Sequence, residues 1–354
     1  MLTEKDINIF TIVKDKNTIS PLRQWCIDSW HESIPNANIM IFDDNDLNNP
    51  NWKYYDVIKN DRLWNYYKNR EYEDCGCDLK FYRINYSPIS TDSIRIRLLK
   101  AIPNALYMDS DAYLNITSKE FLELCNKYGD FNINVHDLRY PYRFNFDGYF
   151  AGAKNILLDN MIEYYSNMSE RDIVCDHAMV QTFFKTTPRL KEYNNIGLFN
   201  TIDKNIIHLS LSSIKPFNIK EYGINKIVVY IGDRTNSRIN KLVEQYRASN
   251  EDHMYIDYIK NIIHDKLFNS GIRFGKNELH IYLFNIETVY TSLDRDRIHH
   301  EDGRVFAIAK MYHSFFDKLG LHDEFVEKLK GTIDAYFKPM LNGGEIIYQE
   351  LPEL

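Results

Sequence analysis

Two aspartates separated by one residue are the strongest candidates for chemistry in this sequence. Asp109 and Asp111 follow the apolar segment Ala105–Met108, which predicts a short β-strand. Residues i and i+2 of a strand point to the same side, so both carboxylates are expected on one face. Mg²⁺ and Mn²⁺ prefer such carboxylates together with phosphate oxygens, and the metal then carries charge on a diphosphate or phosphoryl group. The alternative is a polar turn after a strand.

A predicted helix precedes this pair and adds further polar groups. The segment Thr91–Leu99 has helical spacing and ends before Pro103. Asp92 and Arg95 are three residues apart, which puts them on one helix face within reach of each other. Without a functional role they would form an exposed ion pair of little energetic value. The opposite, buried face of the helix is expected to carry Ile94, Leu98 and Ala101.

The order of these features resembles a known family of glycosyltransferases. An S/T-D-x-x-R helix, a short apolar strand and a Y-x-D-x-D sequence are typical of the sugar-binding DXD transferases. These include mannosyl- and galactosyltransferase-like proteins of bacteria and fungi and the clostridial-type toxin glucosyltransferases. The resemblance spans residues 6–217, and its motif residues are Thr91, Asp92, Arg95, Tyr107, Asp109 and Asp111.

Segments outside the motif are also similar to that family. Trp25–Trp30 is similar to its first helix, and Phe146–Lys154 resembles the strand behind its sugar pocket. Cys175–Gln181 resembles a helix start of related retaining transferases. Ile206–Ser210 resembles the late histidine segment that closes the nucleotide site. One departure is Pro103-Asn104, where the family usually has two glycines before the DxD strand.

The resemblance implies a GT-A fold, in which helices flank a Rossmann-like mixed sheet. The alternation of expected strands and helices independently indicates an α/β layered sheet. The expected strands include Ile7–Val13, Asn38–Phe42 and Ile206–Leu211, and the expected helices include residues 118–127, 155–168 and 174–186.

Two domains are expected, with a boundary after Phe217. Residues 1–217 would form the GT-A-like domain that binds the nucleotide sugar, and residues 218–354 an accessory domain for acceptor docking or oligomerisation. The second domain is expected to be an α/β or mostly helical appendage. Its expected strands are Lys226–Asp233 and Leu279–Phe284, and its expected helices cover residues 235–248, 251–268, 304–318 and 322–337.

The resemblance implies a metal and nucleotide site. Asp111 would be the primary ligand of Mn²⁺ or Mg²⁺, and Asp109 would bind the metal or the ribose. His208 would be a ligand or a hydrogen-bond donor to phosphate, the alternative being a structural histidine at a strand end. Tyr107 and Lys215 are further candidates for contact with the nucleotide. A UDP-sugar is the favoured donor, and GDP stays open.

The resemblance also implies groups for the transfer step. Arg95 would contact phosphate or a sugar hydroxyl with its planar, always charged guanidinium, and Asp92 would accept hydrogen bonds from sugar hydroxyls. Asp176 and His177 are candidates for the face where the sugar reacts, the alternative being an N-cap before a helix. The family implies retention of anomeric configuration, with the leaving diphosphate as base, so no nucleophile is assigned.

Two other functions stay open. Leu106–Asp111 also resembles the nucleophile strand of haloacid-dehalogenase phosphohydrolases, Val228–Ser237 resembles their metal loop, and Lys215 could bind the phosphate. Against this, Tyr113 and Ser237 stand where that class has a small residue and an acid. The other alternative is a non-catalytic binding protein on a degenerate transferase fold.

Composition limits the partners of this chain. It has 354 residues, of which 44% are hydrophobic, enough for a substantial core. A net charge of −7 argues against a broad nucleic-acid-binding face. No apolar segment approaches the ~20 residues of a membrane helix, and no signal-peptide pattern is expected at the start. Five scattered cysteines do not predict a disulfide framework.

We therefore expect a cytoplasmic bacterial enzyme that acts on a glycan, lipid-linked or protein acceptor. Polysaccharide biosynthesis and the modification of host proteins by a secreted effector are both open roles. Peripheral attachment at the inner membrane face and homo-oligomerisation through residues 218–354 are also open.

Overall fold

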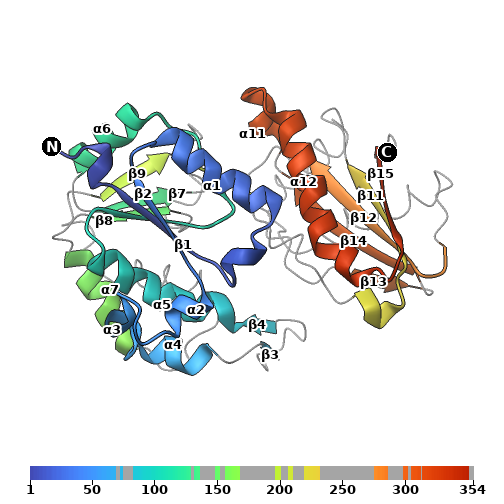
Figure 1. Ribbon diagram of the computed structural model, residues 1–354, viewed down its shortest axis with the longest axis horizontal. Coiled ribbons are helices and arrows are strands. Elements are labelled where there is room, and N and C mark those ends of the chain that lie inside the picture. The colour runs from blue at the N-terminus through green and yellow to red at the C-terminus, as the bar shows by residue number, and fades with distance from the viewer. Residues whose placement is uncertain are drawn as a thin grey trace, which may run out of the picture. The chain divides into compact units, whose positions relative to one another are not determined.

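The chain divides into two compact units, each with its own main sheet (Figure 1). The first comprises Met1–Ile19 and Arg23–His208, and the second Ser20–Leu22 and Leu209–Leu354. This division falls before the predicted boundary at residue 217. The computed structural model describes residues 1–68, 72–74, 83–128, 131–135, 148–151, 156–167, 196–200, 206–209, 219–231, 275–285, 298–301, 304–311 and 313–350.

The first unit is built on a six-stranded mixed sheet in the order β2-β1-β5-β8-β7-β9. β1 pairs in parallel with β2 and β5, and β8 pairs antiparallel with β5 and β7. The strands are β1 (Asn8–Ile12), β2 (Asn38–Phe42), β5 (Ala105–Met108), β7 (Phe131–Val135), β8 (Gly148–Ala151) and β9 (Ile196–Asn200). The predicted α/β class with a mixed sheet flanked by helices is confirmed.

Two short ribbons accompany this sheet. They pair β6 (Ala112–Leu114) with β10 (Ile206–His208), and β3 (Tyr72–Asp74) with β4 (Arg83–Asn85), each antiparallel. The expected strand at 206–211 is thus shorter than predicted within the described residues. The β3–β4 ribbon precedes Thr91 in the sequence.

Helices cover both faces of the six-stranded sheet (Figure 1). One face carries α1 (Pro21–Ser33) and α6 (Ser118–Tyr128). The other carries α3 (Tyr55–Ile58), α4 (Arg62–Tyr67), α5 (Tyr86–Ala101) and α7 (Ile156–Asn167). The short helices are α2 (Asp44–Leu47) and the 3-10 turns Glu4–Asp6 and Lys16–Thr18.

The strand β5 distributes its side chains between these two layers. Ala105 and Tyr107 lie in the core that includes α5, whereas Leu106 and Met108 lie in the core that includes α1. This is the alternation that a fully buried strand requires. The turn that follows β5 therefore lies between the helix layer that contains α5 and the helix layer that contains α1.

A left-handed residue leads into β5. Asn104 has a φ of 46°, a conformation that glycine adopts readily and that asparagine tolerates better than most residues. Its carbonyl accepts a hydrogen bond of 3.0 Å from the Asn8 amide, and the Asn8 side chain donates to the Pro103 carbonyl at 2.7 Å. Asn104 thus makes the turn into β5 without a glycine.

The helix α5 is longer than the predicted helix Thr91–Leu99, and its buried face differs from the predicted one at one residue. Ile94 and Leu98 are fully buried as expected, together with Ile96 and Leu99. Ala101, predicted on the buried face, is exposed, because Leu98, Leu99 and Ile102 face the core at this end of α5 and Ala101 lies on the solvent side. The chain then reverses direction before β5.

One buried carboxylate joins three helices on this face. Asp61 accepts hydrogen bonds of 2.8 Å from the Trp64 amide, which caps α4, and from the Ser93 hydroxyl of α5. Its other oxygen accepts from Arg97 Nε at 2.5 Å, and Arg97 Nη2 reaches Ser166 of α7 at 3.1 Å. α5, which carries the candidate site residues, is thereby fixed against α4 and α7.

The second unit contains a five-stranded sheet in the order β13-β14-β12-β11-β15. All neighbours are parallel except β13, which pairs antiparallel at one edge. Its elements are β11 (Lys226–Ile231), β12 (Glu278–Asn285), β13 (Ile298–Glu301), β14 (Arg304–Met311), α11 (His313–Lys318), α12 (His322–Phe337), β15 (Glu345–Glu350), and the 3-10 turns Ile219–Tyr222 and Lys338–Met340. Of the two predicted alternatives, α/β describes this unit.

The helix α12 packs along one face of that sheet (Figure 1). The Tyr348 hydroxyl of β15 lies 2.9 Å from the Lys330 carbonyl and 2.8 Å from an oxygen of Asp334. The predicted helix at 322–337 is confirmed. The helix predicted for 304–318 is wrong in its first half, which is the apolar strand β14 paired with β12, and its second half contains the helix α11. The helices predicted at 174–186, 235–248 and 251–268 lie outside the described residues.

A chain of polar side chains joins β11 and β12. Lys226 Nζ lies 2.9 Å from Glu278, whose other oxygen lies 3.2 Å from His280 Nε2. His280 Nδ1 lies 3.1 Å from the Tyr230 hydroxyl. Burial lowers the pKa of His280, so a neutral ring that donates from Nε2 and accepts at Nδ1 satisfies both neighbours. The network favours one register of the two strands.

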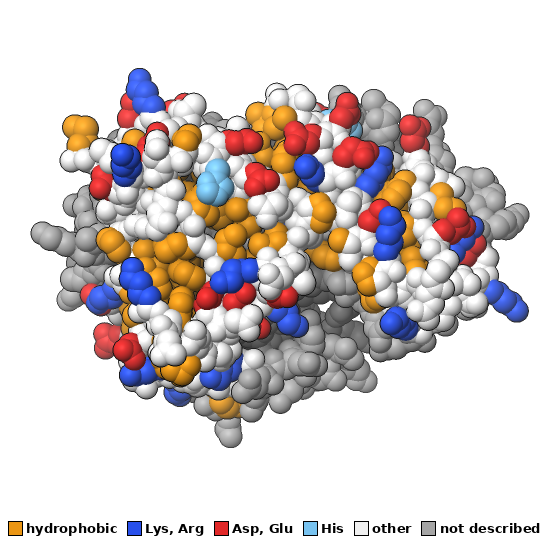
Figure 2. Space-filling model, viewed as in Figure 1, with side chains coloured by type: hydrophobic (Ala, Val, Ile, Leu, Met, Phe, Trp, Pro, Cys, Tyr) orange, Lys and Arg blue, Asp and Glu red, His pale blue; other side chains and the backbone are white. Residues whose placement is uncertain are grey.

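The described helices and the charges on one face of the molecule bear on the predictions about partners. None of the helices in the described ranges is long and apolar enough to cross a bilayer. On the face shown in Figure 2, acidic and basic side chains are interspersed, without a continuous basic patch among the residues described there. Phosphate backbones are usually bound by such a patch.

Replacing Asp61 by alanine should destabilise the protein by about 3 kcal/mol, because the change removes a helix cap and leaves Arg97 and Ser93 without their acceptor. Urea unfolding followed by circular dichroism measures this. The matched control is Asp56→Ala, which removes a carboxylate that is 84% exposed and pairs only across one helical turn with Lys59. An equal loss of stability in the two variants would contradict the conclusion that Asp61 connects these helices.

Candidate active site

Asp109 and Asp111 lie in a tight turn. β5 ends at Met108, and the Ala112 amide donates to the Asp109 carbonyl at 2.9 Å, which closes the turn before β6. The expectation that both carboxylates extend from one face of a strand is therefore not met, because strand alternation stops at Met108. The directions of the two side chains depend instead on the groups that hold the turn.

Asp109 is held from the α5 side of the sheet. Tyr107, which is almost fully buried, donates its hydroxyl to Asp109 Oδ1. Arg95 Nη2 lies 3.6 Å from the same oxygen, and its guanidinium carbon lies 4.5 Å from the centre of the Tyr107 ring. Arg95 also donates to the Thr91 hydroxyl at 3.4 Å. Four residues of the predicted motif are thus brought together.

The pair of Arg95 and Asp109 is shielded from water but still accessible. The side chain of Arg95 is 15% exposed and that of Asp109 is 24% exposed. An ion pair in this position is screened less than one on the open surface. Both groups can therefore contact a ligand while the ion pair between them stays intact.

The rest of the turn faces α1. Ser110 is 5% exposed, and its Oγ accepts a hydrogen bond of 3.1 Å from Arg23 Nη1. Asp111 is 8% exposed. Burial, and after it the charge of Asp111, raises the pKa of the Cys26 thiol. The carboxylate of Asp111 therefore lies close enough to α1 to act on a side chain of that helix.

The same helix anchors the strand that follows the turn. Trp30 Nε1 donates to the Ala112 carbonyl at 2.8 Å. The Ser29 hydroxyl accepts from the Leu114 amide at 2.9 Å. Ser29 and Trp30 are the last two residues of the C-I-D-S-W sequence in α1. This sequence therefore satisfies backbone groups of β6 that would otherwise be buried without partners.

The strand β10 pairs with β6 and brings the late histidine segment to the turn. In their antiparallel register, Ile206 is opposite Leu114 and His208 is opposite Ala112. The backbone of His208 consequently lies beside the residue that follows Asp111. The side chain of His208 lies outside the described residues.

Several predicted site residues receive no structural test. The side chain of Asp92 lies outside the described residues, although its backbone belongs to α5. Asp176, His177 and Lys215 also lie outside them. Within the segment predicted as the strand behind the sugar pocket, Gly148–Ala151 forms β8 and pairs with β5.

The donor set of the turn fits a hard divalent cation that is shared with a ligand. No cluster of three or more His, Cys, Asp or Glu side chains able to hold a metal occurs in the ranges that the structure describes. Mg²⁺ and related ions are nevertheless often held by one or two carboxylates while phosphates of a ligand supply other oxygens. Asp109 and Asp111 offer that minimum, with Asp109 accessible to solvent.

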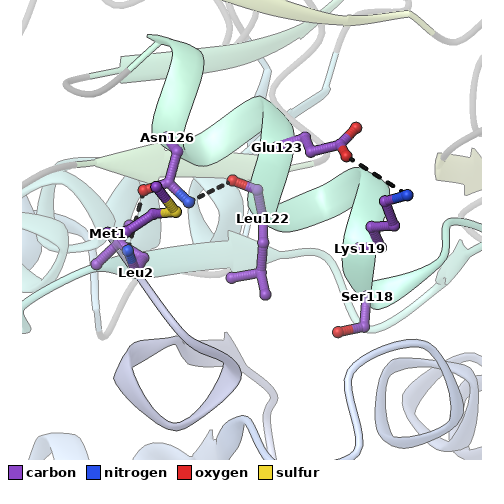
Figure 3. Close-up of a pocket in the computed structure, with 7 residues that line it drawn as sticks. All are labelled: Met1, Leu2, Ser118, Lys119, Leu122, Glu123 and Asn126. Carbon is purple, nitrogen blue, oxygen red and sulfur yellow. Dashed lines mark hydrogen bonds and ion pairs between the residues drawn. The ribbon is translucent and has the colours of Figure 1, made fainter.

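A shallow apolar pocket lies elsewhere on the first unit, between the N-terminal residues and α6 (Figure 3). The Leu2 amide donates to Asn126 Oδ1 at 2.9 Å across it. Its lining consists of Met1, Leu2, Ser118, Lys119, Leu122, Glu123 and Asn126. None of these residues belongs to the turn or to the groups that hold it, so the pocket is separate from the candidate site.

The phosphohydrolase alternative draws on segments from two different sheets. Leu106–Asp111 begins in β5 of the first unit, whereas Val228–Ser237 begins in β11 of the second. Sites in α/β proteins form where loops leave neighbouring strands of one sheet. The two segments belong to different sheets, so no single sheet edge brings them together.

Solved structures that resemble this chain at low similarity include glycosyltransferases. No protein-family model matches the chain, and no curated protein matches its sequence. A glycosyltransferase involved in the glycosylation of the major capsid of PBCV-1 has a TM-score of 0.31 and 13% sequence identity to this chain. The match covers 55% of this chain and 82% of that glycosyltransferase chain. An active-site mutant of LgtC has a TM-score of 0.29 and 12% identity, covering 55% and 73% respectively.

Replacing Ser29 by alanine should destabilise the protein by about 2 kcal/mol, because the buried Leu114 amide loses its acceptor. The control is Ser33→Ala on the same helix. It removes a hydroxyl that donates to the Leu114 carbonyl at 3.0 Å from a partly exposed position, so its effect should be smaller. Chemical unfolding of both variants measures the difference, and a larger loss for Ser33→Ala would contradict the anchoring role of Ser29.

Proposed function

We propose that this chain is a divalent-cation-dependent glycosyltransferase. It would transfer a sugar from a nucleotide diphosphate sugar, with UDP favoured, to a glycan, lipid-linked or protein acceptor. The observation that carries this proposal is the pairing of β6 with β10, which aligns the backbone of His208 with Ala112 beside Asp111. Two segments far apart in the sequence, each similar to a part of one nucleotide-sugar site, thereby meet at one turn.

The chemistry requires charge to be stabilised on the departing diphosphate. A divalent cation supplies that stabilisation when bound, as a Lewis acid and as a template. Asp111 would be its primary protein ligand, and Asp109 would bind either the cation or the ribose. His208 would complete the set or donate to phosphate.

The position of Arg95 supports a role for it at the donor. Its guanidinium lies over the Tyr107 ring and beside Asp109, so its position is fixed before any ligand arrives. A fixed, permanently charged fork suits a phosphate or a sugar hydroxyl. Asp92, three residues earlier on α5, would accept hydrogen bonds from sugar hydroxyls.

The proposal includes retention of anomeric configuration. In that case one oxygen of the leaving diphosphate accepts the proton of the acceptor hydroxyl on the same face of the sugar. The chain then needs no strong nucleophile, and none is assigned. Asp176 and His177 are the candidates for groups that line the reacting face.

Calorimetry with a panel of UDP- and GDP-sugars, with and without Mn²⁺, tests the class of donor. We expect one donor to bind only with the metal, and Asp111→Asn to weaken that binding by more than the ~10–100-fold typical of outer groups at metal sites. The control is Asp28→Asn, an exposed carboxylate of α1 that pairs with Gln24. Absence of binding by every nucleotide sugar would contradict the proposal and favour a non-catalytic protein.

Hydrolysis of p-nitrophenyl phosphate is the complementary assay. A glycosyltransferase should show none above background with Mg²⁺. Metal-dependent hydrolysis that disappears in Asp109→Asn would instead support the phosphohydrolase alternative.

Two arginines of α5 provide a matched pair for the role of the donor contact. Arg95→Gln should weaken donor binding by about tenfold or more, since a charged hydrogen bond to the ligand is lost. Arg97→Gln should mainly lower stability, because Arg97 bonds the buried Asp61 and Ser166. Donor affinity and urea unfolding are measured for both. Weaker donor binding in Arg97→Gln than in Arg95→Gln, with the larger loss of stability in Arg95→Gln, would contradict the role of Arg95.

A further inference from the structure

Arg23 occupies an unfavourable place on α1 unless it has a specific partner. It lies in the first turn of a helix that begins at Pro21 and ends at Ser33. A cation at a helix N-terminus is repelled by the positive end of the helix dipole. The side chain is also only partly exposed, so water offsets little of that cost.

The partner of Arg23 is the middle residue of the Asp109–Asp111 turn. Arg23 Nη1 donates to Ser110 Oγ at 3.1 Å, and Ser110 is 5% exposed. Leu106 and Met108 face the core that contains α1, and the turn after β5 presents Ser110 to the same helix. Asp109 is held on the side of α5 by Tyr107 and Arg95.

We propose that Arg23 is a positioning residue that arranges the two aspartates for a divalent cation, acting through Ser110. This inference rests on the glycosyltransferase function proposed above. Arg95 and Tyr107 hold the turn through contacts with Asp109. Arg23 holds it through a hydrogen bond to Ser110. With one anchor only, the peptide between Ser110 and Asp111 could rotate, and cation binding would have to order it.

The electrostatic consequence follows from the same geometry. Burial and the charge of Asp111 raise the pKa of the Cys26 thiol, and the charge of Arg23 lowers it, so both groups act on one point inside α1. Because Arg23 bonds Ser110, the residue before Asp111, it also places positive charge close to that carboxylate. Groups that orient the ligands of a metal typically contribute 10–100-fold to its affinity.

The test is a double-mutant cycle on cation affinity. Mn²⁺ binding in the presence of UDP is measured by calorimetry and by the electron paramagnetic resonance signal of free Mn²⁺, for wild type, Arg23→Ala, Ser110→Ala and the double variant. We expect each single change to weaken Mn²⁺ affinity by about tenfold, and the double change to weaken it by little more than either. Thermal unfolding of each variant separates this effect from loss of the fold.

Two further variants sharpen the interpretation. Arg62→Ala removes an exposed arginine of α4 and should leave Mn²⁺ affinity unchanged. Arg23→Lys keeps the charge but loses the planar fork, so it should recover only part of the affinity. If Arg23→Ala fails to fold, Ser110→Ala still tests the contact, because it deletes only one oxygen.

The outcomes distinguish this inference from the function on which it rests. If wild type binds Mn²⁺ with UDP and Asp111→Asn abolishes this, unchanged affinity in Arg23→Ala or in Ser110→Ala overturns the positioning role alone. Purely additive losses in the double variant also overturn it, since the two residues would then act separately. If wild type shows no Mn²⁺-dependent binding of UDP, both the function and the inference are overturned.

Discussion

Two carboxylates within three residues have to be held in a turn that is largely shielded from water. Asp111 is 8% exposed, and the side chain of Asp109 is 24% exposed. Buried charge is costly unless opposite charge and hydrogen bonds compensate it. The first unit meets this constraint from both layers of its α/β/α arrangement, with Arg95 on α5 and Arg23 on α1. The positions of both helices therefore matter for the turn.

Each of these helices is in turn fixed by other polar contacts. α5 is fixed by the buried carboxylate of Asp61, which also caps α4. α1 is fixed to the far side of the turn by Trp30 and Ser29, which bond the backbone of β6. β6 is paired on its free edge by β10. A cation bound at the turn would thus be attached to the sheet, to both helix layers and to a late segment of the first unit.

Local patterns in the sequence predicted much of this arrangement, and long-range contacts account for what they missed. Strands β1, β2 and β5 and the core of α5 follow from apolar spacing, and Asn104 adopts a left-handed conformation that asparagine tolerates. Trp30 could not be assigned its role, because its partner is 82 residues away in the sequence. The pairing of Arg304–Met311 with β12 likewise overrode an apparent helix.

In the candidate site, too, local patterns predicted some contacts and missed others. The contact of Arg95 with Asp109 was within reach of a motif argument, although the predicted partner of Arg95 was Asp92. The premise that Asp109 and Asp111 extend from a strand was not met, since a hydrogen-bonded turn replaces the strand one residue earlier. Arg23 gave only a weak signal, a cation in the first turn of a helix, and no sequence pattern indicated Ser110 as its partner.

The central claim is that the turn after β5 holds a divalent cation together with the diphosphate of a donor. Anomalous diffraction at the manganese absorption edge, on crystals grown with UDP and Mn²⁺, tests it most directly. The account predicts a single strong peak bonded to a carboxylate oxygen of Asp111 and to oxygens of the diphosphate. A diphosphate bound without a peak at this turn, or a manganese peak at other residues only, would contradict it.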